Sequence, residues 1–528
     1  MFRTIFFIFD FSFRHYLDLS DSNVDVFIQG ITLQGGKPKW VEGSAIHVVT
    51  DGKVEIDKCV IRNNSSSTVK LISNGKIDMN KCVITKNKGS STLIYLASES
   101  DLLIKDNSLL SNSIDNGSLI SIDFGNSNIL MIDNTIMSNT GRSVVCVSVG
   151  DHNNSGTNHI LNFEKNMITK NESREAHPVL NITYLKSIFI TSNTITNNPA
   201  GIKIGNCYTA KIINNIIKHN SNGSIAIAKA NNISITSNEI IGNKVADSNQ
   251  VGFYVNNINS GLISNNYIAW NNGFHAGGIK SNNSNLTILN NIIIHNTSEY
   301  TGGGISLFYG GTTNIINNSI YNNKCRFAAS LGGGLYIEAN DSTSFNIYNN
   351  IFWNNTAPSG NDIYIKDYAD SAALYNNIYT DLVGAYDQAG NNSDSDPMFA
   401  DPQNNDYHLS PNSPCINAGN NDAPNLPETD LDYLPRIVDN VVDIGAYEFT
   451  TTEKIPSDQN EDWALTQEEF NAYAEAWRKG ETWQKGPEPI PIDYVTRSGY
   501  LQKKGENYKN EGGKKPTCWK PDENNTKK

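Results

Sequence analysis

The sequence is poor in charge, proline and long apolar runs. Charged residues occupy 18% of its 528 positions, and it contains 17 prolines and six methionines. No apolar stretch reaches the ~20 residues that a transmembrane helix needs, so no membrane span is expected. The net charge is −13 and Lys and Arg are not clustered, which argues against a nucleic-acid partner.

Cysteine is also scarce. Seven cysteines are too few for a disulfide scaffold in a chain of this length, and an odd number leaves at least one thiol unpaired. The apolar residues 5–9 faintly resemble a signal peptide, but Asp10 interrupts the run and no small-residue cleavage site follows. We therefore expect that the true start of the protein is missing or wrongly assigned.

What the sequence has in excess is asparagine, which occupies 76 positions and recurs in two columns. The first column repeats every 22 to 32 residues and comprises Cys59, Cys82, Asn107, Asn134, Asn166, Asn193, Asn215, Asn238, Asn266, Asn291, Asn318, Asn350 and Asn377. A second column follows five residues later and comprises Asn64, Asn87, Asn112, Asn139, Asn171, Asn198, Asn220, Asn243, Asn271, Asn296, Asn323 and Asn355. Apolar residues keep the same step on both sides of the first column.

The spacing of these apolar residues indicates short β-strands. They alternate with a period of two on each side of a two-residue bend, whereas helical repeats would show a period of 3.6. Strands joined by tight bends and repeated in this way predict a coil with three short sheets per turn, stacked into parallel sheets. Asparagine suits the bends because it tolerates left-handed backbone and because stacked amides can bond to one another.

This pattern resembles the right-handed parallel β-helix of the pectate-lyase-like superfamily, over residues 22–385 and about 13–14 coils, with residues 1–21 as a separate N-terminal segment. The later coils add segments similar to motifs of bacterial surface β-helices and polymorphic outer-membrane proteins: Gly277-Gly278-Ile279, Gly302-Gly303-Gly304-Ile305, Gly332-Gly333-Gly334-Leu335 and Phe352-Trp353-Asn354-Asn355. The resemblance implies an all-β protein that is extracellular or attached to the cell surface. It implies no single activity, because this fold carries lyases, hydrolases, epimerases and adhesins alike.

A second set of motifs fills residues 386–450, among them Asp396-Pro397-Met398-Phe399 and Ser413-Pro414-Cys415. This region resembles the choice-of-anchor Q region that closes many secreted bacterial β-helix proteins. Such a region would cap the unpaired strand edges at the end of a solenoid. Asp430 or Asp443 with Arg436 could be read as an active site, but an ion-paired cap is the interpretation we favour.

The composition changes after residue 450, where 27 of 78 residues are charged against 68 of the first 450. Residues 451–485 contain the spacing of a calcium loop, formed by Asp458, Asn460, Asp462, Thr466 and Glu469. This segment resembles one half of a dockerin or EF-hand and would bind Ca²⁺, although a tryptophan replaces the turn glycine and no second loop follows. A solvated helix cap is the alternative. Residues 486–528, rich in Lys, Gly and Trp, are expected to be flexible.

The coils offer few candidates for catalysis. They contain none of the Asn-Thr-Asp, Asp-Asp, Gly-His-Gly or Trp-Ile-Asp-His segments of polysaccharide hydrolases and lyases. His219 and His295 should lie three coils, or roughly 14 Å, apart, which is too far for one metal ion. Cys59 and Cys82 should stand on consecutive coils as a reduced pair, because parallel in-register side chains fit a disulfide poorly.

Aromatic residues appear at the outward positions of the later coils. Tyr267, Tyr321 and Trp353 form a predicted stripe that could stack on sugar rings or on a partner, unless loops or the C-terminal module cover it. These features predict a secreted or surface-associated β-helix protein with a binding, adhesive or structural role towards a polysaccharide or a cell-surface partner. The alternative is a polysaccharide lyase or glycoside hydrolase that acts on acidic polysaccharide.

Overall fold

The structure, a computed structural model, covers most of the chain. It describes residues 3–8, 12–13, 17–20, 24–35, 45–65, 68–124, 128–149, 159–173, 177–245, 253–340, 343–366, 372–451, 453–483 and 490–522.

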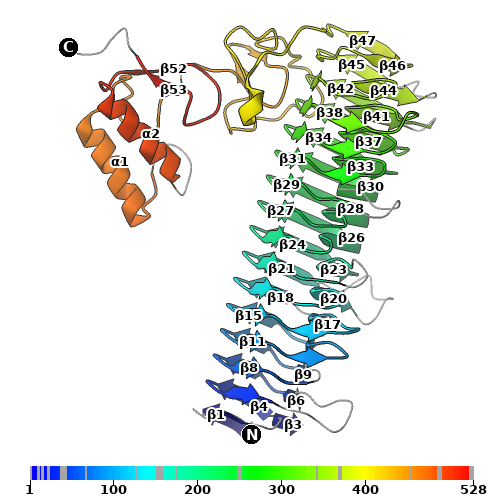
Figure 1. Cartoon of the computed structure of the whole chain (residues 1–528), viewed down its shortest axis with the longest axis vertical. Helices are drawn as coiled ribbons and strands as arrows, with labels where there is room; N and C mark the ends of the chain where they lie inside the picture. The colour runs from blue at the N-terminus through cyan, green and yellow to red at the C-terminus, as the bar shows by residue number, and fades with distance from the viewer. Residues whose placement is uncertain are drawn as a thin grey trace.

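Most of the chain winds into a long solenoid (Figure 1). One coil contains three strands, for example β9 (Val69–Ser73), β10 (Ile77–Asn80) and β11 (Val83–Thr85). Strands of successive coils pair in parallel, so that β10 lies between β7 (Val54–Asp57) and β14 (Leu102–Lys105). Within the described residues these pairings form a 28-stranded and a 14-stranded sheet. The predicted right-handed parallel β-helix is confirmed, and the 14-stranded sheet supplies one strand per coil.

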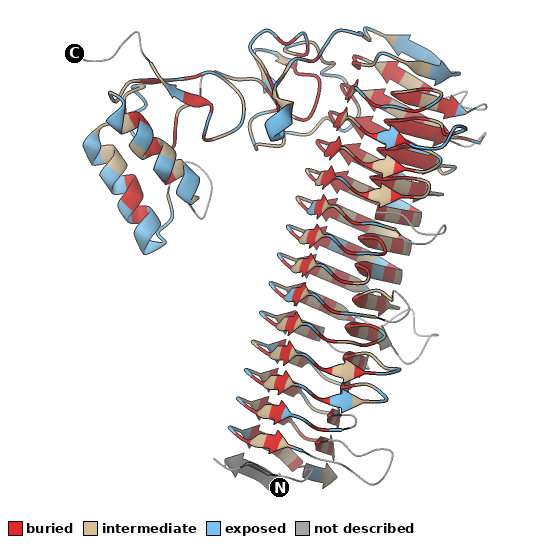
Figure 2. Ribbon diagram, viewed as in Figure 1, coloured by how far each residue is buried: buried red, intermediate tan, exposed pale blue. Residues whose placement is uncertain are grey.

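Buried residues alternate with less buried ones along the strands, and the coils in Figure 2 are coloured by this burial. In β9, Val69 and Leu71 are fully buried, whereas the intervening Lys70 and Ile72 lie nearer the surface. This alternation follows from the pleat of a strand, in which successive side chains point to opposite faces. Two of the three strands merge in the middle coils, giving β26 (Ile202–Ile213), β28 (Ile225–Thr236) and β30 (Phe253–Ser264).

The asparagine columns form buried hydrogen-bond ladders, as predicted. Asn134, which is 1% exposed, donates from Nδ2 to Asn166 Oδ1 of the next coil (2.9 Å) and to Ile104 O of the preceding coil (2.8 Å). Its Oδ1 accepts the backbone N–H of Asn107 at 3.0 Å. Each amide therefore satisfies polar groups on three coils at once, in an interior where unpaired groups are costly.

The left-handed residue of the first bend is not the ladder asparagine but its predecessor. Fourteen such residues have φ between 51° and 58°: Lys58, Lys81, Asp106, Asp133, Lys165, Ser192, Asn214, Ser237, Asn265, Asn290, Asn317, Asn349, Asn376 and Asn391. The expectation that the ladder asparagines themselves take this conformation was therefore wrong. They are selected for their amides, and the varied residues before them carry the backbone strain.

Other residues replace asparagine at one end of each column: Cys59 and Cys82 begin the first column, and Asp362 follows the last asparagine of the second. The thiols of Cys59 and Cys82 are free, as expected, and lie 3.6 Å from Ile28 O and 3.7 Å from Ile56 O, the kind of carbonyl that a ladder amide would reach. At the other end of the second column, Asp362 Oδ1 accepts from Asn355 Nδ2 at 2.9 Å.

The solenoid extends slightly beyond the predicted residues 22–385. β1 (Arg3–Ile8), β2 (Ser12–Phe13) and β3 (Leu17–Ser20) pair with β4 (Val24–Gln29), β5 (Thr32–Gln34) and β6 (Ile46–Thr50). The N-terminal segment therefore supplies strands of a further coil. At the other end the last paired strands are β46 (Leu382–Gly384) and β47 (Gln388–Gly390).

The segment 391–450 lies along the side of the upper coils, against the 14-stranded sheet (Figure 1). It contains two short antiparallel pairs, β48 (Phe399–Asp401) with β49 (Asp406–Leu409) and β50 (Ile437–Val438) with β51 (Val441–Val442). We call this segment the side cap, because its contacts run along several coils rather than across the end of the solenoid.

The last residues fold into a small unit instead of a flexible tail. It contains α1 (Gln467–Lys479), α2 (Ile492–Lys503) and a hairpin of β52 (Tyr508–Asn510) and β53 (Trp519–Pro521). Trp519 is 0% exposed and packs with Leu501 and Tyr508. The expected flexibility of 486–528 was wrong for the described part, because these apolar side chains build a core despite the charged composition. Among the described residues, no helix is long and apolar enough to cross a membrane.

Candidate functional site

The side cap covers the predicted aromatic stripe. Tyr267 and Tyr321 pack in one cluster with Tyr407 of the cap, and the rings of Tyr321 and Tyr407 lie 5.5 Å apart. Trp353 packs in a neighbouring cluster that includes Leu409 of the cap. Tyr267, Tyr321 and Trp353 therefore form an interface within the chain. This is the arrangement in which the C-terminal module covers the predicted stripe.

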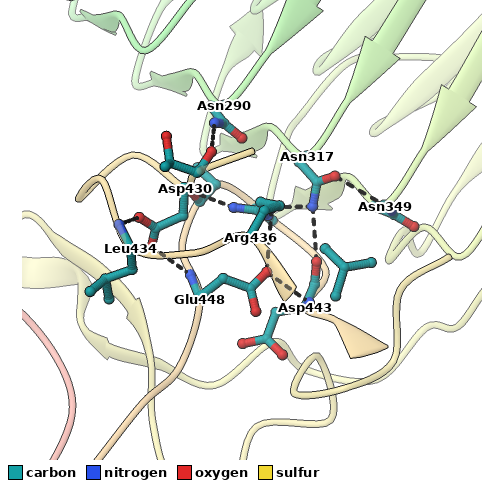
Figure 3. A network of polar contacts seen from close by, with 12 residues as sticks. Asn290, Asn317, Asn349, Asp430, Leu434, Arg436, Asp443 and Glu448 are labelled. Atoms are coloured by element: carbon teal, nitrogen blue, oxygen red, sulfur yellow. Dashed lines mark hydrogen bonds and ion pairs between the residues drawn. The ribbon is translucent and has the colours of Figure 1, made fainter. Parts of the chain in front are cut away.

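Asparagines before the ladder hold the side cap in place (Figure 3). Asn290 Nδ2 donates to Thr429 O at 2.8 Å, and Asn317 Nδ2 donates to Asp443 O at 2.9 Å. Asn376 Nδ2 likewise donates to Ala418 O at 2.8 Å. A sequence signal for this docking existed in the Asn-Asn doublets of the last coils, which the ladder pattern alone did not explain.

The acidic and basic residues of the side cap form a buried structural cluster. Arg436 is 1% exposed, its Nε lies 3.3 Å from Glu448 Oε1, and its Nη1 donates to Ala446 O at 3.1 Å. Asp430 accepts the backbone N–H groups of Leu434 and Glu448, both at 2.8 Å. Burial raises the pKa of Asp430 to about 6 and also raises the pKa of Asp443. Asp430 and Asp443 bond to the cap's own backbone, and the ion pair of Arg436 is with Glu448 rather than with either aspartate of the predicted pair.

In the predicted calcium loop, side-chain oxygens accept hydrogen bonds from other residues of the C-terminal unit. Glu469 Oε1 accepts from Gln459 N at 3.0 Å, and Oε2 accepts from Thr466 N at 3.0 Å and Thr466 Oγ1 at 2.9 Å. Asp458 Oδ2 accepts the Tyr508 hydroxyl at 2.6 Å. Across the described residues, no group of three or more His, Cys, Asp or Glu side chains could hold a metal ion.

A Ca²⁺ site needs several oxygens turned to one point, and binding of Ca²⁺ by this loop stays a prediction. The capping box of Thr466 and Glu469 is the contact that the helix-cap alternative predicts. The remaining predicted ligands, Asn460 and Asp462, bond to each other, with Asn460 Nδ2 donating to Asp462 Oδ2 at 3.2 Å.

The two histidines of the coils are apart, as expected. His219 and His295 both occupy the left-handed position of the second bend, with Gly242 and Trp270 at that position in the two coils between them. His295 Nε2 lies 3.1 Å from the Tyr407 hydroxyl of the side cap. His295 therefore has a structural partner.

A different set of aromatic residues lies on the large sheet of the upper coils; Tyr336 at its centre is buried, and Tyr254, Phe308 and Tyr364 are partly exposed. It is built on β30 and on β33 (Ile279–Asn282), β37 (Ile305–Phe308), β41 (Leu335–Glu338) and β44 (Ile363–Lys366). In register, Tyr254 pairs with Lys280, Lys280 with Ser306, Ser306 with Tyr336 and Tyr336 with Tyr364. These outward positions place one side chain per coil on a single row.

The rings of this row contact one another and Phe308, which lies on the same strands two residues after Ser306. Tyr336 and Tyr364 stack with centroids 5.9 Å apart and an interplanar angle of 18°. Phe308 lies 5.4 Å from Tyr336, and Lys280 Nζ lies 5.3 Å from the Phe308 ring. Burial raises the pKa of Tyr336, whose hydroxyl donates to Glu338 Oε2 at 2.8 Å.

A second row of rings lies at the turns that lead into these strands. Phe274 and Tyr300 have centroids 4.4 Å apart, and Tyr300 and Phe327 have centroids 4.9 Å apart. His275 joins the two rows, 5.6 Å from Tyr300 and 5.9 Å from Phe308. We call the two rows together the aromatic face; Tyr300 is 38% and Phe327 44% exposed.

Glu338 provides a polar edge to the aromatic face. It accepts the Tyr309 hydroxyl at 3.1 Å and forms an ion pair with Lys366 at 2.8 Å. Burial would raise the pKa of Glu338, but the bonds from Lys366, Tyr336 and Tyr309 outweigh it and lower the pKa. An ionised carboxylate held in this way can accept hydrogen bonds from the hydroxyls of a ligand.

The glycine runs bring the coils of the aromatic face together. A Cβ on Gly278 would lie 2.4 Å from Gly304 O, and one on Gly304 would lie 2.6 Å from Gly334 O. Any other residue would force these coils apart. The glycine motifs were recognised in the sequence, but the rows that they align depend on strand register, which no local pattern contains.

The comparisons agree with this architecture. A family described as the right-handed beta helix region matches residues 18–179 and 240–379, together more than half of the chain. No curated protein matches the sequence. The chain thus belongs to the right-handed β-helix family.

Proposed function

We propose that this protein is a secreted or surface-associated carbohydrate-binding protein whose aromatic face holds a polysaccharide chain. The observation that carries the proposal is the turn row of Phe274, Tyr300 and Phe327, which climbs from coil to coil beside the strand row and in which Tyr300 and Phe327 are exposed. Aromatic faces pack against the C–H faces of sugar rings, and exposed aromatic groupings of this kind mark binding surfaces.

The direction of the two rows supports a long ligand over a small one. In the turn row, three successive coils each add a ring, about 4.8 Å above the last, the strand spacing in a sheet. A polysaccharide that runs parallel to the solenoid axis therefore meets a new ring at each step. The choice-of-anchor Q resemblance of the side cap is consistent with a place outside the cell.

Two exposed residues test the proposal. Tyr300→Ala and Phe327→Ala each remove one ring from the turn row, and each should weaken binding roughly three- to tenfold. The measurement is affinity electrophoresis of the full chain in gels that contain neutral or acidic polysaccharides, followed by calorimetry with oligosaccharides of those that retard it.

Tyr208→Ala is the matched control, because Tyr208 is 56% exposed but lies outside the aromatic face. This variant should bind like the wild type. A wild-type chain that no polysaccharide retards would refute the proposal, as would equal binding by the two face variants. Sustained release of unsaturated products or reducing sugar would instead support the lyase or hydrolase alternative.

A further inference from the structure

Opposite charges are concentrated in two separate parts of the chain. Residues 367–435 contain twelve acidic residues and no Lys or Arg, against a net charge of −13 for the whole chain. Residues 490–520, in contrast, contain seven Lys or Arg and three acidic residues. Complementary charge on two surfaces favours their contact and selects against wrong partners. The two parts of the chain therefore offer surfaces that can attract each other.

The acidic part includes the last coil of the solenoid, which lies at the upper end in Figure 1. Among the described strands, β46 pairs only with β44, and β47 pairs only with β45 (Ala372–Tyr375), so each has an outer edge without a partner. Val383 in β46 and Tyr386 in the turn before β47 are exposed, and so are Asp387 and Asp394. We call this surface the solenoid end. Free strand edges beside exposed apolar side chains are typical of contact surfaces.

α2 of the C-terminal unit carries the basic part. Tyr500 is exposed, and two cations lie over its ring: Arg497 Cζ is 4.7 Å and Lys504 Nζ is 5.9 Å from the ring centroid. Lys503 is exposed on the same helix, and Lys514 lines an open hollow together with Arg497 and Tyr500. We call this surface the basic face.

The charges of the basic face are not neutralised within the described part of the chain. No acidic side chain there forms an ion pair with its four cations, Arg497, Lys503, Lys504 and Lys514. An acidic residue of the hollow, Asp493, accepts the backbone N–H of Tyr494 at 3.1 Å. Ile492, at the start of the helix, adds an exposed apolar side chain. The basic face is therefore open to a partner that brings both carboxylates and apolar groups.

The solenoid end has the composition that the basic face lacks. Both surfaces combine exposed apolar side chains with charges, which are acidic on one and basic on the other. The chain already uses this charge pairing once, where Lys515 lies 3.9 Å from Asp432 of the side cap. In Figure 1, α2 lies on the opposite side of the side cap from β46 and β47, so the two surfaces of one chain do not meet. A second copy supplies the partner of each.

We infer that the basic face of one copy docks on the solenoid end of a second copy. The cations of the basic face meet the carboxylates of Asp387 and Asp394, while its apolar groups pack against Val383 and Tyr386. Because the two surfaces differ, the contact is heterologous: each pair of copies keeps one free surface of each kind, and further copies add head to tail. The inference goes beyond the proposed function and uses no residue of the aromatic face.

Sedimentation velocity of the full chain over a range of concentrations tests this contact. The mean mass of the wild type should rise with concentration beyond that of a dimer, because each added copy presents a new free surface. The association should weaken as sodium chloride is raised, because salt screens exposed charges. A wild type that stays monomeric up to about 0.1 mM would overturn the inference.

Two double variants remove one surface each. Lys503→Gln with Lys504→Gln neutralises the basic face, and Asp387→Asn with Asp394→Asn neutralises the solenoid end. Each double variant alone should associate at least about tenfold more weakly than the wild type. Mixed in equal amounts, the two should form a dimer that grows no further, because one copy supplies the intact basic face and the other the intact solenoid end. A mixture that stays monomeric, while the wild type associates, would show that these surfaces are not the ones in contact.

Lys203→Gln with Lys229→Gln is the matched control, because both lysines are exposed on the middle coils and the net charge changes equally. This control should associate like the wild type. An equal loss in the control would make net charge the cause and contradict the basic face. A monomeric wild type whose basic face binds dextran sulfate would assign that face to an anionic polymer instead of a second copy. Melting temperatures within about 2 °C of the wild type would show that no variant acts through folding.

Discussion

Asparagine plays three separate structural parts in this protein. In the ladders its amide connects three coils, as Asn296 does by donating to Asn323 Oδ1 at 3.0 Å and to Ile268 O at 2.8 Å. One position earlier, residues such as Asn317 adopt left-handed backbone, with φ of 51°, and reach out to the side cap. At exposed positions the amide makes only a surface hydrogen bond, as Asn259 Nδ2 does by donating to Asn231 Oδ1 at 2.8 Å. Burial and backbone conformation decide which part each asparagine has.

Replacing a ladder asparagine should destabilise the solenoid strongly. In Asn296→Ala, the N–H of Asn271 and the carbonyl of Ile268 lose their partners inside the core. We expect a loss of about 3 kcal/mol in the free energy of unfolding, measured by urea denaturation. Asn259→Ala, which removes only an exposed bond, should cost less than about 0.5 kcal/mol. Equal costs for the two variants would contradict the structural role of the ladder.

At the scale of single elements, the start of α1 shows how one sequence pattern fits two structures. Thr466 and Glu469 form a capping box, in which the Thr466 side chain accepts from Glu469 N and the Glu469 side chain accepts from Thr466 N. The same two residues occupy positions 9 and 12 of the predicted calcium loop. Spacing alone does not distinguish the two, because both need an acidic residue in the first turn of a helix.

Glu469→Ala should destabilise the C-terminal unit by about 1 kcal/mol or more, since it removes the capping box and the acceptor of Gln459 N. Thermal melting followed by circular dichroism at 222 nm, the usual helix band, would measure this. Glu468→Ala is the control, because Glu468 lies in the same turn but is exposed and should cost only a few tenths of a kcal/mol. A rise in the melting temperature of the wild type, but not of Glu469→Ala, on addition of Ca²⁺ would instead support the calcium loop.

At the scale of the whole molecule, a buried charge cluster connects the side cap to the C-terminal unit. His408 Nδ1 lies 2.6 Å from Asp406 Oδ1, and its Nε2 lies 3.1 Å from Asp432 Oδ2. From the C-terminal unit, Lys515 lies 3.9 Å from Asp432 and 2.9 Å from Glu453, a residue of the connecting segment. The His408 ring also stacks on Tyr447, with centroids 3.8 Å apart.

This cluster should make stability fall at alkaline pH. Burial alone would lower the pKa of His408, but its bonds to Asp406 and Asp432 outweigh burial and raise the pKa to about 9. The stabilisation is therefore complete below pH ~6.5 and is lost as pH rises through about 9, an effect on the order of 3 kcal/mol. Calorimetric melting between pH 6 and 10 should show a steeper decline for the wild type than for His408→Gln. Parallel declines would exclude His408 as the cause.

At acidic pH, the carboxylates of the same cluster should make stability fall as the pH is lowered. The pKa values of Asp406 and Asp432 are lowered: burial would raise them, but their bonds to His408 outweigh it. Their contribution is therefore present above pH ~4 and is lost at lower pH. The contact between the side cap and the C-terminal unit should therefore be most stable between pH ~4 and pH ~6.5, where both contributions are complete.

The sequence by itself determined the coils, because a period-two apolar pattern and a ladder amide are local requirements that every repeat has to meet. Asn134, Asn296 and the free thiols of Cys59 and Cys82 all lie where the spacing placed them. Which outward residues face solvent was decided only by the tertiary structure. Tyr321 and Tyr300 look alike in the sequence, yet the side cap packs against the first, which is partly buried, and leaves the second exposed. The reason is that docking joins residues more than a hundred positions apart, such as Asn317 and Asp443, and no repeat pattern records such a contact.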